Sequence, residues 1–209
     1  SKYTEQQSKL NATVPSKRIK DALFIVKAPS FWFIGIAFFL ISINHGIVLS
    51  HMLPIFKERG LTVGVAVLMA SLLGPMQVVG RLAMLIIENH VSIFAICIAS
   101  FTAMFIAGLV LYFGSAVVGL IFLFVVAQGC GYGVVIISRP LIIAQLLGRN
   151  DFGVVAGLLA MGFLIGTAVA PSLGSLLWLN GGYDLVILVA ICIPILAVVS
   201  LIGAWRYQS

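Results

Sequence analysis

One arginine interrupts a long apolar run and is the first candidate for chemistry. The run is GPMQVVGRLAMLII, residues 74–87, and Arg81 is its charged residue. An arginine keeps its proton in a protein, and hydrocarbon is a costly place for a charge. One helical face carries small and polar residues at offsets of 3, 6 and 10, namely Ser71, Gly74, Gln77 and Arg81. Gln77 lies one turn before Arg81, where its amide oxygen can accept a hydrogen bond from the guanidinium.

Two roles for Arg81 remain open. In the first, its helical face lines an aqueous cavity, and the guanidinium binds an anion through its fork of N–H donors. In the second, Arg81 extends to the lipid headgroups, because residues 61–80 are already long enough to cross a membrane. The apolar sequence LAMLII that follows Arg81 favours the cavity.

A second polar stripe lies in a later apolar run. Gln128, Tyr132 and Arg139 follow one another at offsets of 4 and 11, which places them within about 40° on a helix. Hydrogen-bonding groups that end in a cation are what the wall of a cavity for an organic anion needs. The alternative role of Arg139 is to anchor the headgroup region, because residues 116–138 suffice to cross and Pro140 can end the span.

The first apolar run contains an amide and two imidazoles. Asn44 and His51 are seven residues apart and share a helical face, and His45 is adjacent. A histidine within the membrane can carry a proton or bind a substrate. The alternative is a neutral imidazole bonded to a backbone carbonyl, and His51 is expected near the outer boundary. Asn44 and His45 join Arg81, Gln77, Arg139, Tyr132 and Gln128 as candidate substrate-binding residues.

Carboxylates are confined to the ends of the apolar runs and to the polar N-terminal stretch: Glu5, Asp21, Glu58, Glu88, Asp151 and Asp184. The histidines are therefore the side chains within the runs that could accept a proton near neutral pH. The alternative is that a coupling acid belongs to another segment of polypeptide.

The cysteines predict neither a disulfide framework nor a metal site. Cys97, Cys130 and Cys192 all fall in apolar runs and show no paired spacing. Buried packing is the expected role for such residues. No metal and no cofactor is expected.

The composition is that of an integral membrane protein. Hydrophobic residues make up 62% of the chain and charged residues 9%, with a mean hydropathy of +1.20. A soluble domain has roughly 25% charged residues. Long uninterrupted apolar runs favour helices over the alternating strands of a membrane β-barrel. The net charge of +6 comes without a basic stripe or a nucleic-acid-binding motif, so nucleic acid is not an expected partner.

Six membrane spans are predicted in an all-α bundle that occupies residues 30–209: 31–53, 61–87, 91–113, 116–146, 152–179 and 185–205. Short connections force successive helices into an up-down, antiparallel arrangement, with the lipid bilayer as partner. Residues 1–29 are expected to be a cytoplasmic linker. Within it a short basic amphipathic helix is predicted, with apolar residues Ile19, Ala22, Leu23 and Val26; a plain solvated linker is the alternative.

Basic residues predict the orientation in a plasma membrane or a bacterial inner membrane. Four precede the first span, and two more fall on the same side by alternation: Lys17, Arg18, Lys20, Lys27, Arg149 and Arg206. Lys57 and Arg59 lie on the opposite side. The positive-inside rule then places both termini in the cytoplasm.

Small residues predict where helices pack. Gly162 and Gly166 form a G-x-x-x-G pair that lets another backbone approach, and Gly174 extends the small face. Pro171 removes a helical hydrogen bond and is expected to bend the fifth span. Because the second span is also rich in glycine, a three-helix unit repeated in inverted orientation is predicted, with the second and fifth spans equivalent.

These features resemble the C-terminal half of a major facilitator superfamily transporter over residues 17–205. GFLIGTAVAPSLGSLLWLNGGYD is similar to the eleventh helix and following loop of that superfamily. VVGRLAMLIIENH is similar to its eighth-helix ending, normally G-R-L-x-x-G-x-L-x-D-R, but lacks the second glycine and the acidic–basic pair. HMLPIFKERGLTVGVAVLMASLLG and GRNDFGVVAGL look most like the monocarboxylate and oxalate/formate branch.

The resemblance implies a secondary carrier, a symporter or antiporter, for a small organic anion such as a mono- or dicarboxylate. Arg81 matches the eighth-helix arginine that holds the substrate carboxylate in that branch. Where some members place an aspartate one turn earlier, this chain has Gln77. The N-terminal six-helix half of the same polypeptide would supply the facing wall, and the halves would rock about a site near the midplane.

Two other classes compete with the carrier. A complete six-span protein could form a homo-oligomeric channel or small carrier. An intramembrane serine protease needs a serine in a glycine-flanked turn and a histidine on a later helix. Gly174-Ser175 is a weak match, and no histidine follows His90, so the chain is not expected to be an enzyme.

Overall fold

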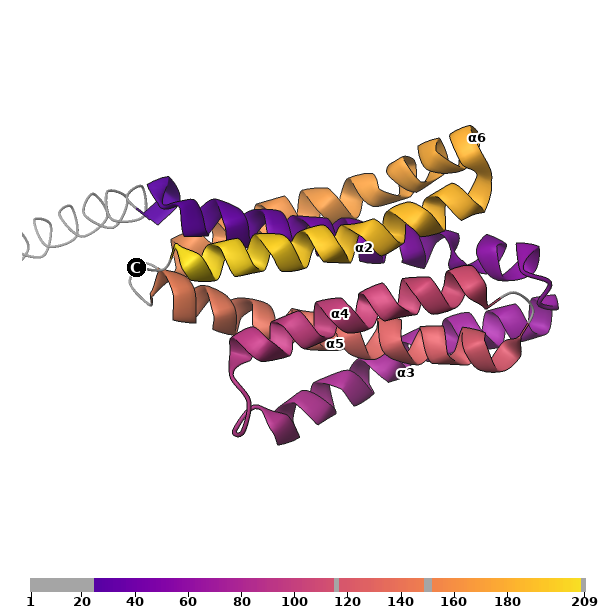
Figure 1. Ribbon diagram of the computed structural model, residues 1–209, viewed down its shortest axis with the longest axis horizontal. Helices are drawn as coiled ribbons and strands as arrows, with labels where there is room; N and C mark the ends of the chain where they lie inside the picture. Colours follow the sequence, from indigo (N-terminus) through magenta and orange to yellow (C-terminus); the bar gives the residue numbers. More distant parts are fainter. Residues whose placement is uncertain (1–24, 115–116, 149–151, 208–209) are drawn as a thin grey trace, which may run out of the picture.

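The computed structural model describes residues 25–114, 117–148 and 152–207, and their secondary structure is all-helical. Five helices are long and apolar enough to cross a membrane, as in a multi-pass membrane protein. They are α2 (Pro29–Glu58), α3 (Val63–Ile87), α4 (Ile93–Phe113), α5 (Val118–Leu147) and α6 (Phe152–Arg206) (Figure 1). Most of the predicted linker, including Ile19, Ala22 and Leu23, lies outside the described residues.

Helix α6 reverses its direction near its middle. Gly181 and Gly182 have non-helical backbone angles, and Gly182 has a φ of 66°, a conformation that favours glycine. A first arm, residues 152–180, and a second arm, residues 183–206, therefore run in opposite directions (Figure 1). The described parts of the predicted ranges fall largely on helical segments, and successive segments alternate in direction along the bundle.

Helices α2 and α5 continue through the prolines near their expected ends. The first span was expected to end at Leu53, but α2 runs through Pro54 to Glu58. The reason is tertiary, because Ile55 and Phe56 are buried and the Phe56 ring meets Phe124 edge to face. Helix α5 likewise continues through Pro140, with buried residues beyond it. Packing contacts thus offset the hydrogen bond that each proline removes.

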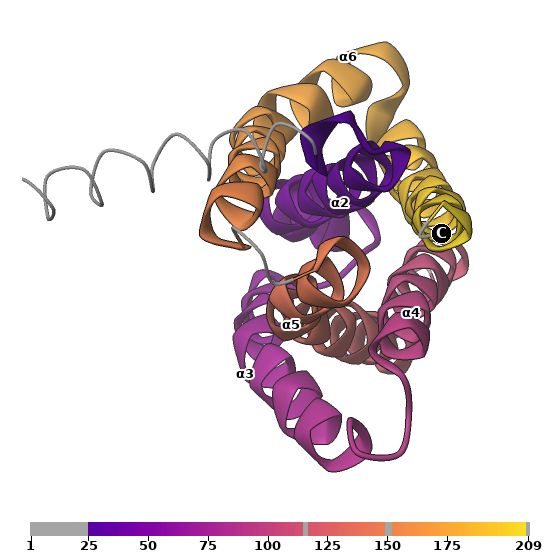
Figure 2. The same ribbon diagram turned by 90° about the vertical axis from the view of Figure 1, so that its left-hand side faces the viewer.

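The segments pack in two groups (Figure 2). Helix α2 packs along α6, and it touches the first arm through Ser42 and the second arm through Asn44. Helix α5 packs against both α3 and α4. Helix α4 joins the groups, because Gly108 packs against Ile191 of the second arm.

The buried apolar side chains form two clusters along the bundle. The first contains Ile47, Phe56 and Phe124, and the second contains Ile34 and Phe101. Among the described residues, α3 contributes to the first cluster and contributes no side chain to the second. The part of α3 beyond Met76, which carries Gln77 and Arg81, therefore runs outside both clusters.

Glycines mark the closest approaches between helices. A Cβ atom added at Gly46, Gly166 or Gly174 would overlap the facing helix of the α2–α6 pair. Gly162 differs from the predicted packing role, because a Cβ there would meet nothing within 4 Å. Pro171 lies inside the first arm, whose helix continues past it.

The G-x-x-x-G pair that lets two backbones meet is on α5. A Cβ at Gly129 would overlap Met76 of α3, and a Cβ at Gly133 would overlap the backbone of Gln77. From the other side, a Cβ at Gly80 would overlap the Cys130 backbone. Close backbone contact of this kind is a main source of helix association in lipid.

An ion pair joins the end of α2 to the turn of α6, and its loss should have a small effect. Arg59 donates to Asp184, whose side chain is 66% exposed. Asp184→Asn is therefore expected to lower the free energy of unfolding by less than about 1 kcal/mol. Arg59→Ala should cost more, because its guanidinium also lies 6.0 Å from the centre of the Tyr112 ring. Thermal unfolding in detergent checks the order, and a larger loss from Asp184→Asn would contradict it.

Candidate functional site

Two buried amides join three helical segments at the centre of the bundle. The Asn44 side chain donates to the carbonyl of Ala190 in the second arm at 2.6 Å. Gln128 of α5 donates to the Asn44 side-chain oxygen at 3.1 Å. Both side chains are 1% exposed. Buried amides need such partners, so this junction fixes how α2, α5 and α6 meet.

Beside this junction, His45 of α2 stacks on Tyr132 of α5. The ring centres are 3.3 Å apart and the ring planes differ by 8°. His45 is 5% exposed, and its Nδ1 atom has no hydrogen-bond partner among the described residues. A buried polar atom without a partner costs about 1–3 kcal/mol. This nitrogen is therefore available to bind a ligand.

Arg139 lies seven residues beyond Tyr132 on α5, and it is half-buried. Its guanidinium lies 4.4 Å from the centre of the Phe163 ring, on the first arm of α6. Such a contact offsets part of the cost of a cation in an apolar setting. Arg139 also lies within electrostatic range of the Tyr132 hydroxyl. The α5 stripe thus runs from buried amide to stacked phenol to half-buried cation, as its spacing predicts.

Arg81 is half-buried on the part of α3 that leaves the core. Its Nε atom is buried and has no hydrogen-bond partner within the described chain. The expected hydrogen bond between Gln77 and Arg81 is not among the contacts of the described residues. Gln77 instead lies with its backbone against Gly133 of α5. Arg81 therefore has a buried N–H donor available to a ligand.

The candidate residues divide into three places. The first place lies between α2 and α5 and contains Asn44, His45, Gln128 and Tyr132. The second is Arg139, two turns further along α5. The third is on α3 and contains Arg81 and Gln77, of which Gln77 contacts α5 through its backbone. Sequence reasoning did not find Phe163 or the Ala190 carbonyl. The spacing of residues along one helix cannot reveal either of them, because both lie on α6 whereas their partners lie on α5 and α2.

His51 has a structural role, as an imidazole bonded to a backbone carbonyl, which was one of the two roles considered for it. Its Nε2 atom donates to the carbonyl of Pro171 at 3.2 Å, and its ring packs over Gly174. The imidazole is thereby fixed between α2 and the first arm. His51 and His45 are two histidines of one helix, one with a partner and one with an unpaired nitrogen.

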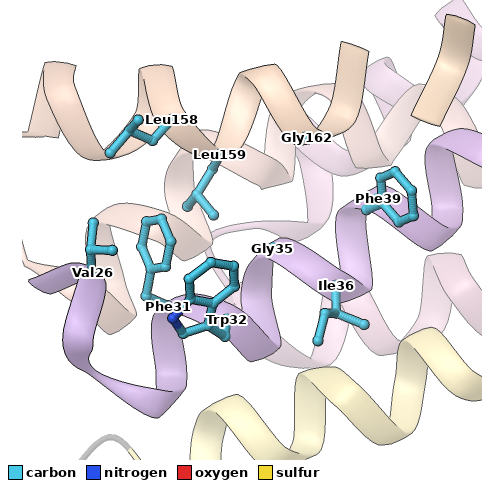
Figure 3. A pocket seen from close by; sticks show the side chains of 9 residues that line it. All are labelled: Val26, Phe31, Trp32, Gly35, Ile36, Phe39, Leu158, Leu159 and Gly162. Carbon is cyan, nitrogen blue, oxygen red and sulfur yellow. The ribbon is translucent and has the colours of Figure 1, made fainter. Parts of the chain in front are cut away.

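Three hollows in the surface of the described bundle are lined mainly by apolar side chains. One lies between α2 and the first arm and has a volume of about 340 Å³. Figure 3 shows Phe31, Trp32 and Leu159 around it, with Gly162 on the facing helix. Gly162 thus borders the open space of this hollow and does not contact the backbone of α2. Such a groove suits an acyl chain and offers no counter-charge to an anion, so the polar cluster is the better candidate site.

The amide junction should act as one unit in a double-mutant cycle. Asn44→Ala removes the acceptor of Gln128 and the donor to Ala190, whereas Gln128→Ala leaves the Asn44–Ala190 bond intact. Asn44→Ala should therefore be the more destabilising change. The coupling energy is expected near 0.6 kcal/mol and below about 2 kcal/mol, as for other interhelical hydrogen bonds in membranes. Unfolding in mixed micelles measures it, and independent effects of the substitutions would contradict the junction.

Comparison with known proteins adds no family to this description. No family model matches the chain, and no curated protein matches it. The functional argument therefore rests on the arrangement of the residues.

Proposed function

We propose that this chain is the C-terminal half of a secondary active transporter of the major facilitator type, and that it moves a small organic anion, such as a mono- or dicarboxylate, by alternating access. The observation that carries the proposal is Arg81, a cation with a buried, unpaired N–H donor on a helix that is otherwise uncharged from Val63 to Ile87. A cation in that setting calls for an anionic or polar partner.

The packing pattern supports an inverted repeat. Helix α2 touches both arms of α6, α5 touches both α3 and α4, and α4 touches the second arm. Exchanging α2 with α5, α3 with the first arm and α4 with the second arm leaves this pattern unchanged. Because the segments alternate in direction, exchanged helices run oppositely, as in inverted-repeat transporters. The equivalent pairs α2–first arm and α5–α3 are also both in glycine contact.

The distribution of charge favours an anion over a cation. The carboxylates of the described residues, Glu58, Glu88 and Asp184, lie at helix ends or at the α6 turn. Arg81 and Arg139 lie further inside the helices. A cationic substrate would find repulsion and no counter-charge there, whereas a carboxylate would meet guanidinium groups suited to bidentate binding.

A carrier of this type needs a facing wall, which the N-terminal half of the same polypeptide would supply. The intact mass of the native gene product from its membrane tests this part of the proposal. A mass of roughly twice 22.3 kDa supports two six-helix halves. A mass near 22.3 kDa would replace the missing half with a homo-oligomer, in which a symmetry axis must supply the facing wall.

The transport activity itself is tested by uptake into proteoliposomes that contain the native polypeptide. Radiolabelled lactate, oxalate and succinate are the probes, and protein-free vesicles and labelled choline are the controls. Saturable uptake of at least one carboxylate, without uptake of choline, is the expected result. Uptake of choline alone, or of none of these probes, would contradict the proposal.

A further inference from the structure

His45 is placed where a bound proton needs a counter-charge. Its imidazole is 5% exposed, stacks on Tyr132 and leaves Nδ1 without a partner. The neighbouring Asn44 does not supply one, because its side chain is turned to Ala190, to which its nitrogen donates, and to Gln128, from which its oxygen accepts. A ligand can satisfy this nitrogen, and a proton bound there would make it an N–H donor that needs an acceptor.

The groups that face His45 from the surrounding segments do not neutralise an imidazolium. Helix α5 brings Tyr132, with Arg139 within electrostatic range of its hydroxyl. The second arm brings the backbone of Ala190 to Asn44, and the first arm packs on α2 through Ala170 and Gly174. On α2 itself, His51 is held by the carbonyl of Pro171.

On α3, the neighbour of α5, the charged group within the helix is Arg81. Carboxylates of the described chain lie at helix ends or at the α6 turn. A proton on His45 would therefore add a buried cation beside Tyr132, which already lies within electrostatic range of the Arg139 guanidinium. Such a charge is costly unless an anion accompanies it. An organic anion would supply the missing charge, and binding of each would strengthen binding of the other by linkage.

We infer that His45 is the proton-binding site that couples transport of the organic anion to uptake of a proton. This inference rests on the proposed function and adds the coupling ion and its residue. The anion and the proton bind together, so the loaded site carries no more charge than the empty one. Tyr132 is a positioning residue, because its ring holds the imidazole in place.

The test measures anion and proton movement in the same vesicles. The native polypeptide is reconstituted with a trapped pH-sensitive dye, and the probe is oxalate, lactate or succinate, whichever shows the largest saturable uptake. Wild-type uptake should acidify the lumen. An inside-alkaline gradient of one pH unit should accumulate the probe about tenfold for each coupled proton. His45→Gln should lose this accumulation. Its exchange of internal for external anion should fall much less, relative to wild type, than its proton-driven accumulation.

His51→Gln is the matched control, because it changes the same residue type on the same helix and should keep proton-driven accumulation. Anion uptake without acidification, or accumulation that survives His45→Gln, would overturn the inference and leave the proposed carrier intact. Wild-type protein that transports no carboxylate would instead remove the proposed function. Should His45→Gln fail to fold, proton uptake on addition of the anion to weakly buffered wild-type protein decides the matter. About one proton per bound anion is expected, and none would overturn the inference.

Discussion

Arg81→Gln is expected to weaken binding of the transported anion by about 100-fold or more. Removing one partner of a desolvated charge pair costs about 2–5 kcal/mol, and each 1.4 kcal/mol is a factor of about ten. Glutamine keeps a hydrogen-bond donor but supplies no charge to a carboxylate. Arg81→Lys should lie between wild type and Arg81→Gln, because lysine keeps the charge but not the planar fork. The concentration dependence of uptake into proteoliposomes measures all three.

Arg206→Gln provides the control for a general effect of lost positive charge. Arg206 is exposed in the last turn of α6, so its removal should leave the half-saturating concentration unchanged. Uptake that Arg81→Gln leaves unaffected would remove the role assigned to Arg81. The carrier proposal would then have to rest on Arg139, whose guanidinium already contacts Phe163.

Gly133→Ala is expected to be the most destabilising single-methyl change in the bundle. The added Cβ would overlap the backbone of Gln77 in α3, which no side-chain rotation can relieve. Overpacking typically costs about 1–3 kcal/mol, and a backbone-to-backbone clash lies at the upper end of that range. The yield of monodisperse protein and its unfolding temperature in detergent should both fall.

Gly162→Ala is the matched control, since a Cβ there would meet nothing within 4 Å. Both glycines belong to G-x-x-x-G pairs and lie inside helices, so helix propensity changes equally. Gly162→Ala should match or slightly exceed wild-type stability, because alanine is the better helix former. Equal losses from both substitutions would contradict the α3–α5 contact.

The helical segments could be predicted from the sequence because apolar runs of membrane length alternate with short breaks. Helix ends could not be predicted as well. The first span was predicted to end at Leu53, just before Pro54, but burial of Ile55 and Phe56 carries α2 to Glu58. That burial depends on Phe124, which is far away in sequence. Local signals such as proline therefore misplace an end wherever a distant helix provides the packing.

The candidate site could be predicted along each helix but not between helices. The spacing of Gln128 and Tyr132 places them on one face of α5, yet the bond to Asn44 and the stack on His45 depend on the relative position of α2 and α5. The same limit explains the glycines. A G-x-x-x-G pair permits a close approach but does not choose the partner: Gly129 and Gly133 both meet α3, whereas Gly166 meets α2 and Gly162 meets open space.

The carrier account is tested most directly by counterflow. Proteoliposomes that contain the native polypeptide are loaded with an unlabelled carboxylate and diluted into a trace of the labelled one, without a pH gradient or a membrane potential. A carrier that alternates access exchanges anions one for one, so the label should rise transiently above its external concentration and then decline. A channel equilibrates the label without such an overshoot. Overshoot with lactate, oxalate or succinate is the result that the account predicts, and label that only equilibrates, or does not enter, would contradict it.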